Sequence, residues 1–223
     1  MSEVVYPGVD GWVQVEQGVA YPGADAWIQL VRGATYPGAS AWVELEGHAQ
    51  KMTYGTSFPA SPADGDLHVL VDSTSTPGYS WLFRYNAGST SPYKWECVGG
   101  VPYTANVDTG ETTNSTSYVA LATAGPSITV PRTGTYIVGL GYSFTVTGGA
   151  GGGLMSYLKG ATAAADADAC QCAITTASLP GGSWREFKRD FSAGDVLAAR
   201  YKVSGNTGNF SQRVLGIVPI RCS

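Results

Sequence analysis

The side chains that could perform acid–base or nucleophilic chemistry are few in this sequence. Only two histidines occur, His48 and His68, too few to support a serine–histidine–aspartate hydrolase. The glycine-rich segment 148–153 lacks the Gly-Lys-Ser/Thr ending of a phosphate-binding loop and is typical of a flexible connection between strands. Because no nucleophile, base and oxyanion donor come together, we expect a protein that is not an enzyme and needs no cofactor.

Metal binding has two weak candidates. Asp166 and Asp168 stand two residues apart in an expected loop and could bind calcium through oxygen atoms, but a solvated acidic loop explains them better. Cys170 and Cys172 lack the Cys-x2-Cys spacing of a zinc site, and no second pair follows. We therefore expect no metal. The cysteines are expected to be free and mostly buried, while disulfides are the alternative, with no pairing deducible. The four are Cys97, Cys170, Cys172 and Cys222.

A ladder of aromatic residues at a spacing of 15 is the third chemical feature. Its members are Tyr6, Trp12, Tyr21, Trp27, Tyr36 and Trp42. Tryptophan faces beside glutamine and aspartate could bind the rings of a glycan. Stacked aromatic residues that pack at a repeat interface are the simpler explanation, and we favour it.

The ladder belongs to three repeats within residues 1–47. Each copy contains Tyr-Pro-Gly, which predicts a type II turn, and then a short alternating strand that follows the tryptophan. One strand face is aliphatic, with Val13, Ile28 and Val43 at equivalent positions. Three such strands cannot form a core alone, so we expect residues 1–47 to attach to another domain, a subunit or a larger particle.

Residues 48–108 are predicted to be a linker and a three-stranded antiparallel meander, with strands at 67–71, 81–85 and 93–98. The stretch from Phe58 to Gly100 contains FPASPADGD, WLFRYNAGS and YKWECVGG. It resembles a module of bacteriophage minor tail proteins and of tail or head fibres. That resemblance implies a virion protein and supplies no catalytic residues.

Residues 109–223 are rich in Thr, Ser, Gly and β-branched residues, with about eight strand candidates that predict a jelly-roll sandwich. The candidates include 118–121, 134–147 and 154–159. The phrases VPRTGTY, from Val130 to Tyr136, and FSAGDV, from Phe191 to Val196, are similar to those of C1q and tumour-necrosis-factor jelly rolls. This resemblance implies a compact homotrimer.

Composition narrows the function further. The fold class is expected to be all-β, because 30 glycines and 12 prolines argue against long helices. A net charge of −4 argues against nucleic-acid binding, and no apolar run could cross a membrane. We expect a virion component of a phage, a tail fibre or minor tail protein whose C-terminal head projects outward and could bind a host receptor. A capsid decoration protein or head fibre is the alternative, and a glycan-binding lectin that uses the repeats is the alternative of another class.

Overall fold

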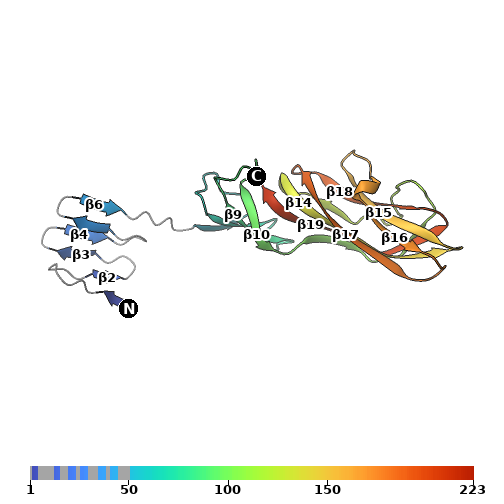
Figure 1. The fold of residues 1–223 in the computed structure, drawn as a ribbon, viewed down its shortest axis with the longest axis horizontal. Coiled ribbons are helices and arrows are strands. Elements are labelled where there is room, and N and C mark those ends of the chain that lie inside the picture. The colour runs from blue at the N-terminus through green and yellow to red at the C-terminus, as the bar shows by residue number, and fades with distance from the viewer. Residues whose placement is uncertain are drawn as a thin grey trace. The chain divides into compact units, whose positions relative to one another are not determined.

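The computed structural model describes residues 2–4, 13–15, 20–23, 26–29, 35–38, 41–44 and 51–223, almost entirely as β-structure (Figure 1). The chain divides into two compact units, Met1–Lys51 and Met52–Ser223. The helical structure of the described residues is a single 3-10 turn, η1 (Asp166–Asp168). None of their helices is long and apolar enough to cross a membrane.

In the first unit the described residues form three antiparallel strand pairs. Their strands are β1 (Ser2–Val4), β2 (Val13–Val15), β3 (Ala20–Gly23), β4 (Ala26–Gln29), β5 (Thr35–Gly38) and β6 (Ala41–Glu44). Pro22 is the register partner of Trp27, and Pro37 that of Trp42. The predicted turn at Pro-Gly is therefore wrong for these two copies, where the motif lies inside the first strand. A strand of a two-stranded sheet has one free edge, which tolerates a residue without an N–H group.

The second unit contains a nine-stranded sheet. Its strands are β7 (Met52–Gly55), β8 (Leu67–Val71), β9 (Ser80–Tyr85), β10 (Trp95–Gly100), β11 (Tyr103–Val107), β12 (Glu111–Thr113), β14 (Gly134–Thr147), β17 (Gly181–Phe191) and β19 (Thr207–Cys222). The longest strand, β19, pairs with β14 on one side and with β12, β11 and β10 in turn on the other. The meander strands β8, β9 and β10 therefore continue the sheet of the C-terminal region.

A four-stranded sheet completes the sandwich, in the order β13 (Ser127–Thr129), β18 (Val196–Val203), β15 (Gly151–Lys159) and β16 (Cys170–Ile174). From β12 onward the chain passes back and forth between the two sheets, except that β15 and β16 are neighbours in the small one, and this arrangement confirms the predicted all-β jelly roll. Three local predictions differ, and the first is the linker before the meander, where Met52–Gly55 form β7 and pair in parallel with β8. Residues 118–121 form no strand, and Val119 makes only an isolated bridge to Tyr201. Gly151–Gly153, expected in a loop, begin β15 and pair with β16. Glycine is needed at position 153 because the ring of Phe144 occupies the space that a Cβ would take.

One hydrophobic core fills the space between the sheets and extends under the meander. Even-numbered residues of β14 from Tyr136 to Val146 point into it, and odd-numbered ones face away. Trp81 of the meander lies 6.3 Å from Tyr136 between ring centroids, so the meander and the sandwich share this core. Burial of these side chains is the main favourable term that holds the unit together.

The two phrases that resemble C1q jelly rolls lie side by side. The amide of Gly194 donates to the carbonyl of Val130 (2.8 Å), and the amide of Val130 donates to the carbonyl of Asp195 (2.8 Å). Gly194 has a φ of +86°, a conformation that favours glycine. At Gly134 a Cβ would lie 2.2 Å from a backbone oxygen of β19. The residue types of both phrases are therefore explained by the packing of residues 130–134 against residues 191–195 and the end of β19.

The motif from Phe58 to Gly100, which resembles a phage module, also has a structural role. Phe58 stacks on Trp95 with ring centroids 4.6 Å apart and planes 6° apart. Glu96 accepts hydrogen bonds from Arg84 (2.8 Å) and Asn86 (2.9 Å) and forms an ion pair with Arg221 (3.0 Å). These contacts, led by the bond from Arg84, hold the pKa of Glu96 below its ordinary value. The motif thus joins β9 and β10 to the end of β19.

Candidate functional site

The outer face of the large sheet, turned away from the core, is uncharged along the middle of β14 and β19, with Glu186 and Lys188 of β17 beside it. We call it the Trp184 face. It consists of Trp184, Ile137, Gly139, Gly141, Val214, Gly216 and Val218, which follow from the strand alternation and register. Trp184 is 56% exposed, although it is a large apolar side chain. An exposed aromatic residue on an apolar strip that is bordered by charged residues is typical of a surface that binds another protein.

Trp184 lies flat because its neighbours are glycines. A Cβ on Gly141 would lie 2.3 Å from the indole, and one on Gly139 would lie 2.6 Å from it. The register places Gly141 between Trp184 and Val214, and Gly139 opposite Gly216. The indole therefore covers bare backbone and presents its other face outward.

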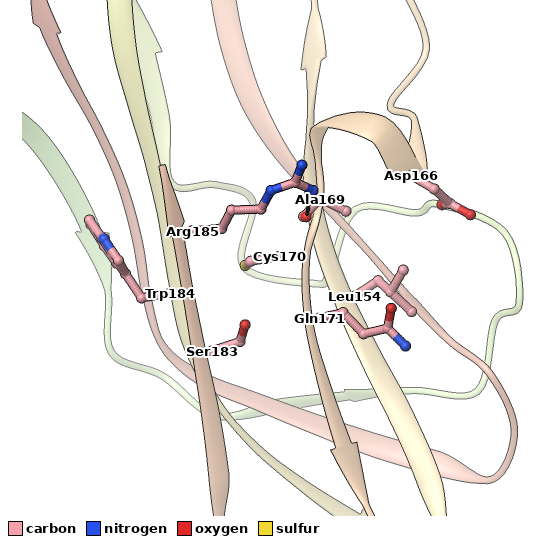
Figure 2. A pocket seen from close by; sticks show the side chains of 8 residues that line it. All are labelled: Leu154, Asp166, Ala169, Cys170, Gln171, Ser183, Trp184 and Arg185. Atoms are coloured by element: carbon pink, nitrogen blue, oxygen red, sulfur yellow. Dashed lines mark hydrogen bonds between the residues drawn. The ribbon is translucent and has the colours of Figure 1, made fainter. Parts of the chain in front are cut away.

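A pocket of about 320 Å³ lies on the other side of β17, where the edges of the two sheets meet (Figure 2). Figure 2 shows Ser183 and Arg185 on one side of the strand and Trp184 on the opposite side. Arg185 donates to the carbonyl of Ala169 (2.7 Å), which ties β17 to the start of β16. Cys170 lies at the base, where burial raises the pKa of its thiol to about 12. Such a thiol is a poor nucleophile at neutral pH.

The cysteines, His68 and Tyr79 owe their shifted pKa values mainly to burial. The cysteines are free, and burial raises the pKa of each thiol. His68 is 2% exposed and bonded through Nδ1 to Thr53 (2.7 Å), and burial lowers its pKa. Burial also raises the pKa of Tyr79 to about 12. His48 lies outside the described residues.

Arg213 is a fully buried charge in the sandwich. It donates to the carbonyls of Thr109 (3.1 Å) and Thr123 (3.3 Å) and pairs with Glu111 (3.4 Å). Glu111 also accepts bonds from the hydroxyl and amide of Thr123, and the hydroxyl bond is the main cause that keeps the pKa of Glu111 low. This cluster fixes the loop between β12 and β13.

The predicted metal candidates are engaged in ion pairs. Asp166 accepts bonds from Lys202 (2.6 Å) and Tyr118 (2.9 Å), and the Lys202 bond is the main cause that lowers its pKa. Asp168 is bonded to Arg189. No group of three possible metal ligands occurs within the described ranges.

The structure describes four of the six residues of the aromatic ladder. Tyr21, Trp27, Tyr36 and Trp42 lie in β3, β4, β5 and β6, whereas Tyr6 and Trp12 lie outside the described residues. The register pairs Tyr21 with Ile28 and Tyr36 with Val43, so copies two and three are alike in backbone pairing. Whether the ladder binds a glycan stays a prediction.

Sequence reasoning missed the Trp184 face, since residue 184 is followed by a stretch with charges of both signs, from Arg185 to Asp190. The available signal was Gly139-x-Gly141 inside a long apolar strand. Two glycines on one strand face leave a flat area that a neighbouring aromatic side chain can cover. The register that brings Trp184 there joins residues more than 40 positions apart and is absent from local patterns.

Comparison with solved structures shows similarities of fold at low sequence identity. The chain is similar to an Eiger TNF from S. frugiperda (13% identity, TM-score 0.40, covering 54% of this chain and 93% of that one). It is also similar to murine APRIL (11%, TM-score 0.31, 51% and 99%). A third similarity is to infectious bursal disease virus, Gx strain (10%, TM-score 0.38, 62% of this chain but 38% of that one). No family model matches the sequence, and the search of curated proteins found no significant match.

Proposed function

We propose that this chain is a non-enzymatic structural component of a phage virion, a tail-fibre or minor tail protein whose Met52–Ser223 unit is a projecting trimeric head. The observation that carries the proposal is the Trp184 face on a jelly-roll sandwich. Its exposed indole, glycines and half-buried aliphatic residues suit burial against another copy. The resemblance of the VPRTGTY and FSAGDV phrases to C1q jelly rolls selects a closed trimer rather than another symmetry.

The phage role is supported by the meander motif from Phe58 to Gly100. Its residues contribute to the pairing of β8, β9 and β10 with one another and with β19, as expected of a structural module. The repeats in residues 1–47 are the proposed attachment segment, because short hairpins need an external surface to complete their burial. A capsid decoration protein or head fibre would use the same parts at another place on the particle.

Two truncations test which end of the chain attaches to the particle and which end binds the host. A chain that lacks residues 1–47 should keep the strand-rich circular dichroism spectrum and the trimeric mass but should no longer join particles. A chain that lacks residues 52–223 should still join particles but fail to support adsorption to host cells. The opposite pattern, with adsorption lost only when the repeats are removed, would favour the lectin alternative and move the binding site to Trp27 and Trp42.

A further inference from the structure

The outer face of the four-stranded sheet has a second pocket, of about 410 Å³. Three parts of the chain meet there: residues 116–118 before β13, residues 163–164 after β15, and the strands β15 and β18 beneath them. Its lining is Thr116, Ser117, Tyr118, Leu158, Ala163, Ala164, Arg200 and Lys202. The volume lies within the ordinary range for small-molecule sites.

The walls of this pocket are held in place by the backbone. Residues 115–119 run along the edge of β18, where Val119 and Tyr201 exchange two backbone hydrogen bonds of 2.9 Å. The loop on the other side is fixed by Ser156, whose hydroxyl contacts the carbonyls of Ala165 (2.9 Å) and Asp168 (3.1 Å). The pocket therefore exists before any ligand arrives, which lowers the ordering cost of binding.

The two cations of the pocket differ in their pairing. Lys202 is neutralised by Asp166 at 2.6 Å, and its Nζ lies 4.8 Å from the ring centroid of Tyr118. Arg200 donates one bond to the carbonyl of Ala199 (2.9 Å) and forms no ion pair within the described part of the chain. Most guanidinium donors of Arg200 are thus available, in the planar arrangement that suits a carboxylate or phosphate group.

The remaining lining restricts the ligand further. Leu158, Ala163 and Ala164 provide an apolar surface, and Ser117 and Thr116 provide hydroxyl groups. A bare inorganic anion would use the cation and leave the apolar surface unfilled. A sugar ring presents C–H groups, hydroxyl groups and, in acidic sugars, an anionic group within one compact unit. This combination matches the three kinds of side chain in the pocket.

We propose that this pocket binds one acidic sugar residue of a surface glycan, with its anionic group on Arg200 and its ring between residues 116–118 and 163–164. The inference deepens the proposed function, since it assigns a ligand class and a site to the projecting head. It is independent of the aromatic ladder of the repeats. The site lies on the sheet opposite to the one that forms the Trp184 face, so a trimer built on that face leaves this pocket open.

The test uses the full chain and free sugars at millimolar concentration, measured by saturation-transfer NMR and titration. Glucuronate and glucose 6-phosphate represent the two anionic groups, and glucose and inorganic phosphate are the two partial ligands. We expect at least one anionic sugar to bind, glucose and phosphate to bind about tenfold more weakly or not at all, and added salt to weaken binding. Equal binding of inorganic phosphate, or no binding of either anionic sugar, would overturn the proposal.

Three variants locate the site. Arg200→Gln should reduce affinity about tenfold or more, because it removes a charge-assisted contact. Ala163→Trp should block the pocket while it keeps the charge. Arg84→Gln, with the same loss of charge on the meander, should bind like the unmodified chain. If sugar binding survives in both Arg200→Gln and Ala163→Trp, the assignment of the site is refuted. If the unmodified chain binds the sugar but does not join particles, only the virion role is refuted.

Discussion

Replacing Trp184 with alanine should weaken self-association of the chain strongly. The tryptophan is 56% exposed in the single chain. For a side chain of about 250 Å² this leaves about 140 Å² to be buried by a partner. At about 25 cal/mol per Å², the upper estimate is about 3.5 kcal/mol for each contact, or about 10 kcal/mol for the three contacts of a trimer.

The stability of the folded chain should decrease less than the self-association does. The indole already covers Gly139 and Gly141, so its removal should lower the free energy of unfolding by about 1–2 kcal/mol, against the 5–15 kcal/mol of an ordinary domain. Sedimentation equilibrium at micromolar concentration separates the two effects. We expect trimers for the unmodified chain and monomers for Trp184→Ala, both with the same circular dichroism spectrum.

Val196→Ala is the matched control, since Val196 is also an exposed apolar residue (43%) but belongs to the other sheet. This variant should have the same trimeric mass in sedimentation equilibrium as the unmodified chain. If Trp184→Ala sediments as the unmodified chain does, the Trp184 face is not the subunit interface, and the reasoning from exposed area is wrong.

Four further predictions concern stability and the repeats. Gly134→Ala should lower the melting temperature by several degrees in calorimetry, because its Cβ would lie 2.2 Å from a backbone oxygen; an unchanged temperature would refute that packing. The folded-state pKa of Glu111 lies below its ordinary value of 4.5, so its stabilising contribution is present above that value and is lost as the pH falls through the folded pKa. Urea titrations should therefore show stability declining below about pH 4.5, and Glu111→Gln should flatten this decline. Cys170 and Cys222, with pKa values of about 12, should resist iodoacetamide at pH 8 until the protein is denatured, and rapid native labelling would contradict their burial. Ile28→Asp should abolish particle incorporation if the aliphatic strand face of the repeats is buried on attachment, and normal incorporation would show that face to be free.

The long strand β14 could be predicted from the sequence to the residue. Its even-numbered residues from Tyr136 to Val146 are all apolar, so the alternation is unambiguous. The first half of β19 could not be predicted, because Gly208 and its polar neighbours are typical of a turn. Gly208 is required there since a Cβ would lie 2.4 Å from the ring of Phe144. Glycines that accommodate a bulky neighbour and glycines that make turns look the same in a sequence.

The candidate surfaces depend on pairings between distant residues. Arg200 and Lys202 stand two residues apart on β18 and so share a strand face, but the pocket needs residues 116–118 and 163–164 to meet over them. The Trp184 face needs the register of β14 with both β17 and β19. Local patterns determine which residues face the same way along one strand, and only the sheet order determines which strands lie next to each other.

The central claim is that this chain is a trimeric component of a virion. Quantitative mass spectrometry of purified particles, from cells that carry the gene, tests it most directly. The account predicts that the chain co-purifies with intact particles in a copy number divisible by three, and that deletion of residues 1–47 removes it from them. Particles that lack the chain, while it accumulates free in the cell lysate, would contradict the account.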